Sequence, residues 1–162
     1  VRSSAASDVY KRQLFLILEN LQDPGNLGTM IRTGEGAGIT GVIMNQQTVD
    51  IFNPKTIRAT MGSIFRVPFV YVSELSPVLT QMHERGIHTY AAHLKGQKYY
   101  DSFSFREPIA FLIGNEGNGL TKEISDQAGQ YLKIPMEGKV ESLNASIAAA
   151  LLMYEAHRQR NL

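Results

Sequence analysis

The chain has 162 residues and a mass of 18.0 kDa, which suits one domain with a substantial buried core. Hydrophobic residues make up 43% and charged residues 19%, and no apolar run approaches the roughly 18 residues of a membrane helix, which argues against a membrane-spanning protein. The absence of cysteine excludes disulfides and thiolate metal sites, and the four histidines lack metal-ligand spacing. A net charge of +1 permits a polyanionic partner without indicating one.

The start of the chain shows neither the strand nor the helix period, and it begins with valine instead of methionine. We therefore interpret residues 1–13 as a non-native or truncated leader, and we expect the folded domain to span residues 14–162.

Short apolar runs and turn residues predict the elements in chain order. A buried strand at residues 14–20 should lead to a helix through residues 27–38, which Asn26 caps and the glycines at 36 and 38 end. The remaining expected elements are a strand at 39–44, a helix at 53–65, a strand at 69–72, a helix at 76–86, strands at 87–94 and 109–115, a short helix at 121–128, a strand at 131–136, and a final helix from about Ser142 to Arg160.

Strands and helices alternate along the chain, and the strands are continuously apolar. This pattern predicts an α/β domain in which helices flank both faces of a mostly parallel sheet. Ligands bind such sheets beyond the carboxyl ends of the strands. Three polar, glycine-bearing stretches follow strands at this edge, at residues 19–26, 114–119 and 137–144, so we expect one site built from all three.

The stretch GNEGNGLT, residues 114–121, comes close to a phosphate-binding P-loop. Gly114 and Gly119 have the required spacing, but Leu120 stands where the pattern needs lysine. Glu116 also places a carboxylate where phosphates would bind. The order of the glycines fails the dinucleotide-binding pattern as well, so a degenerate P-loop is only a rival interpretation.

Taken together, the three stretches resemble the motifs of the SpoU (TrmH) family of RNA ribose 2′-O-methyltransferases in the SPOUT superfamily. NLGTMIRTGEGAG is similar to the first motif, FLIGNEGNGL to the second, and IPMEGKVESLNASIAAALLMYEA to the third. The resemblance covers roughly residues 14–158. It implies a SPOUT-type fold with a C-terminal deep trefoil knot that binds the cofactor S-adenosylmethionine, and no metal.

The positions that match the family motifs imply the site residues. Backbone groups of Gly114, Ile134 and Leu143 should hold the cofactor, Met136 should line its pocket, and Ala92 is a further candidate. An ordinary core would also bury Ile134 and Met136.

The catalytic residues implied by the resemblance are Asn26, Arg32, Glu116, Ser142 and Asn144. Because a guanidinium stays protonated, we expect Arg32 to bind the RNA phosphate and to stabilise charge on the ribose oxygen. Glu116 should orient Arg32 through a bidentate pair. Asn26 and Ser142 also suit helix N-caps, and a structural role is the alternative for Asn144 in the first helical turn.

The resemblance implies a cytoplasmic enzyme that transfers a methyl group from S-adenosylmethionine to a ribose 2′-hydroxyl of tRNA or rRNA. RNA is then the partner, no membrane is involved, and a homodimer forms through the knotted region and the C-terminal helix. The small alanines at 145, 148, 149 and 150 would allow another backbone to approach this helix, although a central core helix is the alternative. A non-catalytic RNA-binding module that keeps the fold is the second rival.

Overall fold

The computed structural model describes residues 12–162, so most of the predicted leader lies outside the described residues. Within this part of the chain, six parallel strands form one sheet in the order β3-β2-β1-β5-β4-β6. This confirms the predicted α/β class, whereas the trefoil knot stays a prediction. The strands are β1 (Leu14–Leu18), β2 (Gly41–Asn45), β3 (Phe69–Val72), β4 (His88–Ala92), β5 (Ile109–Ile113) and β6 (Gln130–Leu132).

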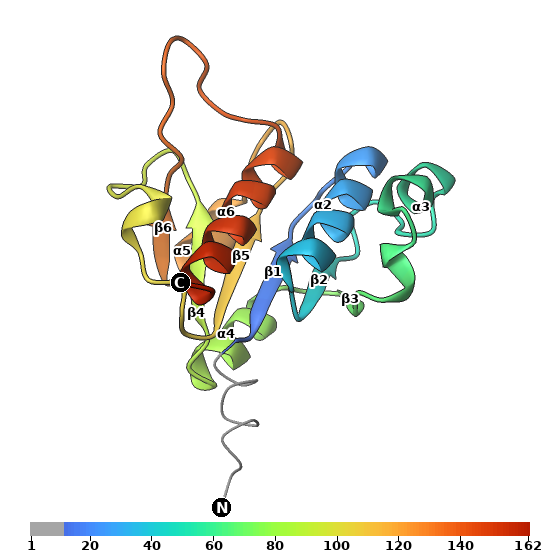
Figure 1. Ribbon diagram of the computed structural model, residues 1–162, viewed down its shortest axis with the longest axis horizontal. Coiled ribbons are helices and arrows are strands. Elements are labelled where there is room, and N and C mark those ends of the chain that lie inside the picture. The colour runs from blue at the N-terminus through green and yellow to red at the C-terminus, as the bar shows by residue number, and fades with distance from the viewer. Residues whose placement is uncertain (1–11) are drawn as a thin grey trace, which may run out of the picture.

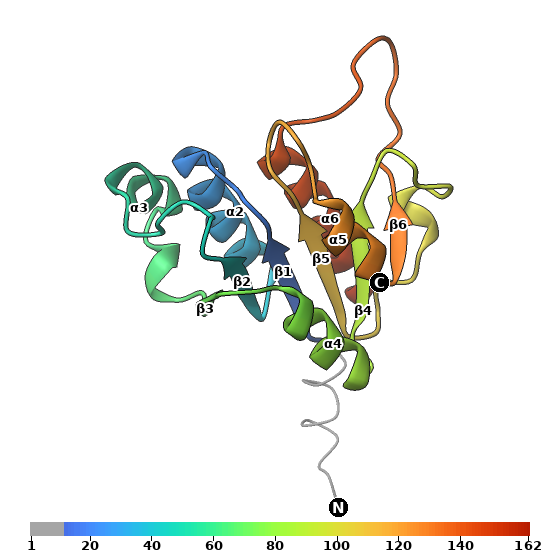
Figure 2. The same cartoon turned by 180° about the vertical axis from the view of Figure 1, so that it is seen from behind.

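Helices cover both faces of the sheet. α2 and α6 lie side by side on one face, with α3 beside α2 (Figure 1), and α4 and α5 lie on the opposite face (Figure 2). Among the described residues, no helix is long and apolar enough to cross a membrane. The helices are α2 (Pro24–Ala37), α3 (Pro54–Thr60), α4 (Ser76–Glu84), α5 (Lys122–Gln127) and α6 (Ala145–Arg160), with short 3-10 turns η1 (Ser63–Phe65) and η2 (Tyr100–Ser102).

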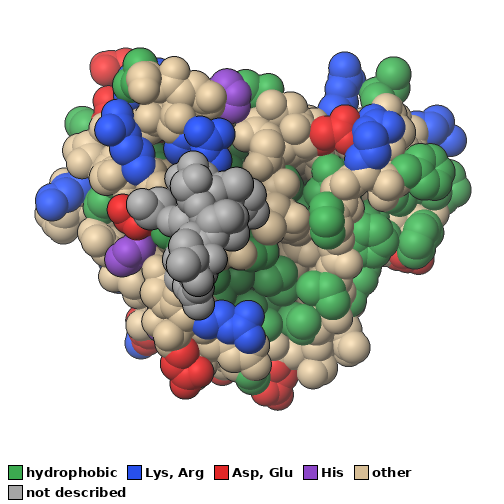
Figure 3. Space-filling view, turned by 60° about the horizontal axis from the view of Figure 1, so that its bottom comes forward, with side chains coloured by type: hydrophobic (Ala, Val, Ile, Leu, Met, Phe, Trp, Pro, Cys, Tyr) green, Lys and Arg blue, Asp and Glu red, His purple; other side chains and the backbone are tan. Residues whose placement is uncertain are grey.

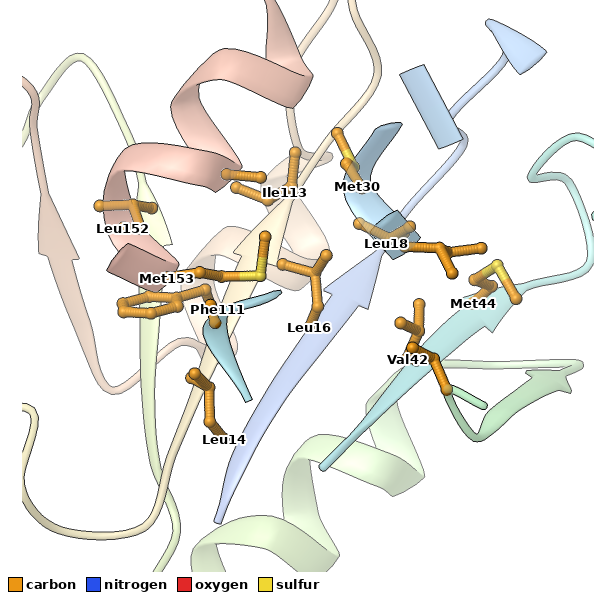
Figure 4. Close-up of a cluster of buried hydrophobic side chains, with 14 of the residues drawn as sticks. Leu14, Leu16, Leu18, Met30, Val42, Met44, Phe111, Ile113, Leu152 and Met153 are labelled. Carbon is orange, nitrogen blue, oxygen red and sulfur yellow. The ribbon is translucent and has the colours of Figure 1, made fainter. Parts of the chain in front are cut away.

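The central strands are apolar throughout because both of their faces are buried. Alternate side chains of β1 and β5 pack under α2 and α6, and the intervening ones, such as Ile17 and Leu112, pack against α4 and α5. Figure 4 shows the larger cluster, in which three strands and two helices meet at Leu14, Leu16, Leu18, Met30, Val42, Met44, Phe111, Ile113, Leu152 and Met153.

The strand register fixes where the loops begin. Leu18 pairs with Ile113, so β1 and β5 end at the same level. The Glu19 N–H then donates to the Ile113 carbonyl at 3.0 Å. The polar stretches after these two strands therefore start side by side at the carboxyl edge, which is the upper edge of the sheet in Figure 1.

The predicted start of α2 was wrong by three residues. The helix begins at Pro24, and its N-cap is Asp23, whose carboxylate accepts the Asn26 N–H at 2.9 Å. Proline in the first turn lacks an N–H that would need a partner there, and an aspartate ahead of it caps well. The helix ends as predicted at Gly38, whose φ of 81° is left-handed, while Gly36 lies within it.

Two further boundaries differ from the prediction. α6 begins at Ala145 with Asn144 as its N-cap, so Ser142 is not the cap. The Asn144 side chain accepts the backbone N–H groups of Ser146 at 2.8 Å and Ile147 at 3.4 Å. β6 ends at Leu132, so the segment after it is free to leave the sheet and line the carboxyl edge.

α3 is also shorter than predicted. It starts at Asn53 and Pro54 as expected, but it ends at Thr60. Met61 has φ 49° and Gly62 has φ 88°, both left-handed, and a right-handed helix cannot continue through them. The remaining residues form the separate turn η1.

Candidate functional site

A cavity of about 280 Å³ opens at the carboxyl edge, beyond the ends of β4, β5 and β6. Its walls come from the glycine turn at 113–120, the segment 132–136 after β6, and the segment 141–145 ahead of α6. The volume is near the lower end of the range for small-molecule pockets, about 300–1,000 Å³. Two of the three polar stretches therefore line one cavity. The third, residues 19–26, was predicted to share it but does not line it, and hydrogen bonds join this stretch to the glycine turn.

The structure brings together all five residues that were predicted to bind a cofactor. Each of them lines this cavity: Ala92, Gly114, Ile134, Met136 and Leu143. The walls also contain residues that the sequence did not single out, among them His93 and Leu94. Both directly follow β4, so the rule that ligands bind beyond the strand ends could have found them.

Gly114 is the tightest point of the glycine turn. A Cβ placed there would lie 2.2 Å from the backbone carbon of Gly119 and 2.2 Å from the backbone nitrogen of Leu120. The turn folds back because the N–H groups of Asn115 and Gly119 donate to each other's carbonyls, at 3.1 and 2.8 Å. Only glycine fits this crossing of two backbone segments, and the absence of a side chain leaves the cavity wall open.

The Glu116 carboxylate holds the first loop against the glycine turn. It accepts the backbone N–H of Asp23 at 2.8 Å and that of Gln22 at 3.0 and 3.2 Å, and the Asn26 amide approaches it at 3.5 Å. The predicted Glu116–Arg32 pair was wrong. Arg32 lies about two and a half helical turns beyond Asp23, whereas the carboxylate binds the backbone N–H groups of Gln22 and Asp23 just ahead of α2.

Two opposing effects set the pKa of Glu116. Partial burial raises the pKa of the carboxyl, but the hydrogen bonds from Asp23, Gln22 and Asn26 outweigh it and hold the pKa below the ordinary value of a glutamate. A carboxyl with a lowered pKa stabilises the folded chain above its unfolded pKa. That contribution is lost as the pH falls through the lowered native pKa.

We therefore expect Glu116→Gln to lower the free energy of unfolding at pH 7, because the uncharged amide binds the N–H groups more weakly. The deficit relative to wild type should shrink as the pH falls to about 3. Urea unfolding at both ends of this range measures it, with the exposed Glu84→Gln as the control. A deficit that stays the same down to pH 3 would contradict the role of the charged carboxylate.

A second set of contacts joins the glycine turn to the end of β1. Glu19 is buried, and its carboxylate accepts the backbone N–H of Thr121 at 2.7 Å and its hydroxyl at 2.9 Å. The Asn115 amide donates to the Asn20 carbonyl at 2.8 Å. These residues were not predicted from the sequence, although Glu19 directly follows a buried strand, and a buried carboxylate requires hydrogen-bond partners.

The residues predicted to be catalytic do not all reach the cavity. Glu116 and Ser142 line it, Asn26 touches Glu116, and Asn144 caps α6. Arg32 lies exposed on α2, outside the cavity wall, and makes no ion pair or hydrogen bond with the residues that the structure describes. Between residues 12 and 162, no group of three or more His, Asp or Glu side chains could hold a metal ion.

Known proteins are similar to this chain in sequence and in fold. Residues 13–154 match the SpoU rRNA Methylase family. A putative TrmH family tRNA/rRNA methyltransferase of Bacillus subtilis, YacO, is 36% identical over 157 residues, which are 97% of this chain and 63% of that protein. The 23S rRNA (guanosine(2553)-2′-O)-methyltransferase RlmP of the same organism is 37% identical over 86% of this chain and 56% of its own length.

Solved structures show the same architecture. The SpoU methyltransferase AviRb from Streptomyces viridochromogenes, in complex with the cofactor AdoMet, superposes with a TM-score of 0.87 at 32% identity. The match covers 93% of this chain and 58% of that chain. The chain thus spans less than two thirds of the length of each of these relatives.

Proposed function

This chain belongs to the SpoU rRNA methylase family, and from that premise we propose that it transfers a methyl group from S-adenosylmethionine to a ribose 2′-hydroxyl of RNA. One observation carries the proposal. The five residues implied by the family motifs as cofactor ligands come from four separate segments of the chain and line one cavity. The 2′-O chemistry is supported by the name of RlmP, and we propose tRNA or rRNA in the cytoplasm as the substrate.

The cavity fits a cofactor with a flat ring and a polar tail. Ile134, Met136 and Leu143 give it apolar walls, and the bare backbone at Gly114 leaves room for close approach. We propose that backbone groups of Gly114, Ile134 and Leu143 hold S-adenosylmethionine, with Met136 and Ala92 against it. When bound, this cofactor supplies a methyl group on a positively charged sulfur.

Side chains at the cavity wall and outside it are proposed to fill the remaining catalytic roles. Methylation of a hydroxyl requires the oxygen to be held in place and its charge to be stabilised as the proton leaves. Arg32 is proposed to bind the adjacent phosphate and the ribose oxygen, and Ser142 offers a hydroxyl at the cavity wall. Because backbone N–H groups already occupy Glu116, we assign it and its neighbour Asn26 to positioning the loops, and Asn144 to holding the Ser142 segment.

A second copy of the chain would bring Arg32 to a cavity. Ile147, Leu151 and Tyr154 expose an apolar face on α6, with 51%, 37% and 46% of each residue accessible. The Tyr154 hydroxyl also lies 2.7 Å from where a Cβ of Gly36 would be, so this face adjoins the outer side of α2 that carries Arg32. We propose a two-fold dimer through the α6 face, in which Arg32 serves the cavity of the partner.

The dimer is tested by sedimentation. We expect the wild type to sediment as a dimer of 18.0 kDa chains at micromolar concentration, and Leu151→Glu to give monomers because it buries a charge at the interface. Leu162→Glu, at an exposed position beyond the helix, is the matched control. A wild-type monomer that retains full activity would count decisively against the dimer.

Cofactor binding is tested by calorimetry in excess chelator. We expect S-adenosylmethionine to bind with unchanged affinity, because the described residues hold no metal-ligand cluster and the proposed contacts are backbone groups. Titration with ATP is the control for the rival P-loop interpretation. Binding of ATP in place of S-adenosylmethionine, or loss of binding on chelation, would refute the assignment.

A further inference from the structure

The side of the molecule that carries α3 exposes several large hydrophobic side chains. Phe52 is 62% exposed, Ile57 38%, Met61 67% and Phe65 88%. We call these four residues, together with Lys55 and Arg58, the α3 patch. Figure 3 shows hydrophobic side chains gathered over the α3 half of the molecule, with Lys and Arg side chains at the rim.

The backbone and a ring contact fix the shape of this patch. The left-handed turn at Met61 and Gly62 ends α3 and starts η1, which sets Met61 and Phe65 on the surface instead of in a continuing helix. The Phe52 ring makes an edge-to-face contact with Phe69 at 6.1 Å between centroids. The contact with Phe69 fixes the position of the Phe52 ring, so a ligand that stacks on this ring does not have to order the side chain first.

The charges of the patch are uncompensated. The side chains of Lys55 and Arg58 are exposed and make no ion pair or hydrogen bond with the part of the chain that the structure describes. The neighbouring Arg66 differs, because it pairs with Glu35 at 2.6 Å. Two unpaired cations among exposed aromatic rings favour a polyanion with flat bases over an apolar protein surface, where lysine is depleted.

The patch is also continuous with the candidate site. The Lys55 Cε lies 3.9 Å from where a Cβ of Gly25 would be, in the first turn of α2. The residues just ahead of that turn are the ones that Glu116 holds against the glycine turn. A strand of RNA that reaches the cavity can therefore continue over α3.

We propose that the α3 patch binds single-stranded RNA that flanks the target nucleotide, with bases stacked on Phe65 and Phe52 and phosphates on Lys55 and Arg58. This rests on the proposed function and deepens it, since it assigns the surface that recognises the substrate. A single strand is the fitting form, because its bases are free to stack on aromatic side chains, whereas those of a duplex are not.

Fluorescence anisotropy with a labelled oligouridylate of about 12 nucleotides tests the proposal, since single-strand sites span about 4–16 nucleotides. We expect Phe65→Ala to weaken binding about tenfold, the size of one lost stacking contact. Lys55→Gln should lower the slope of log affinity against log salt by about 0.7, as expected for one lost phosphate contact. Leu162→Ala and Arg106→Gln, which change exposed residues outside the patch, are the matched controls and should match wild type.

The outcomes separate this proposal from the proposed function. S-adenosylmethionine calorimetry on each variant checks that the fold and the cavity are intact. Suppose that wild type binds and methylates RNA, that Phe65→Ala has the wild-type affinity for RNA, and that Lys55→Gln has the wild-type salt slope. The patch proposal is then overturned, while the proposed function stands. If Phe65→Ala instead shifts only self-association in sedimentation, the patch is an interface between copies and the proposal is overturned. A wild type that neither binds nor methylates RNA overturns both.

Discussion

Arg32→Lys is expected to lower the rate of methyl transfer about 100-fold or more, the scale of losing one donor to a developing oxyanion. Lysine keeps the positive charge but lacks the planar fork that would hold a phosphate and a ribose oxygen together. Arg32→Ala should be at least as damaging and should also weaken RNA binding. Both variants should bind S-adenosylmethionine with nearly unchanged affinity, because Arg32 does not line the cavity of its own chain. Single-turnover transfer beside cofactor titration measures the two effects separately.

Arg106→Lys, a change at another exposed arginine, is the matched control and should keep wild-type turnover. Mixing Arg32→Ala chains with Gly114→Ala chains then tests whether Arg32 acts across the dimer. If it does, about a quarter of wild-type activity should return, because half of the dimers are mixed and each of these has one complete site. An Arg32→Lys enzyme with wild-type turnover would refute the role assigned to Arg32.

Gly114→Ala is expected to weaken S-adenosylmethionine binding at least tenfold. The new Cβ would lie 2.2 Å from backbone atoms of Gly119 and Leu120, so the glycine turn itself must move. Overpacking of this kind also destabilises a fold by about 1–3 kcal/mol. Calorimetry and urea unfolding measure the two effects.

Gly117→Ala in the same turn is the matched control, because a Cβ there meets only the Asn115 side-chain oxygen, at 3.5 Å. Leu143→Pro is a second variant, and it removes one backbone N–H at the cavity without touching the sheet. Leu143→Pro should abolish cofactor binding and leave the midpoint of urea unfolding nearly unchanged. Wild-type affinity in both Gly114→Ala and Leu143→Pro would contradict the assignment of the cavity.

The central strands β1 and β5 were predictable because each is a local apolar run. In β5, for example, all of Ile109–Ile113 is buried, so the sequence needs no long-range information to indicate a central strand. The single edge at which the polar loops meet also followed from the sequence, since parallel strands end on the same side. Which strands pair with each other could not be predicted in this way, because β1 pairs with β2 and also with β5, which lies much later in the chain.

The contacts of Glu116 could not be predicted from its local sequence. Its partners Gln22 and Asp23 are 94 and 93 residues away, and only the level ends of β1 and β5 bring them together. The family motifs marked Glu116 as a site residue, and it lines the cavity, but they did not distinguish a carboxylate that binds the N–H groups of Gln22 and Asp23 from a partner for Arg32. The cap of α2 was misassigned for a local reason, because Asp23 and Asn26 both suit an N-cap and only the position of Pro24 decides between them.

The proposed 2′-O-methyltransferase activity is tested directly by the transfer of tritiated methyl groups from S-adenosylmethionine to total cellular RNA. The labelled RNA is digested to nucleosides, and the position of the label is then read by chromatography against 2′-O-methylated and base-methylated standards. We expect label on the ribose 2′-oxygen, with no requirement for added metal. Label confined to a base, or no transfer by a chain that binds both S-adenosylmethionine and RNA, would contradict it.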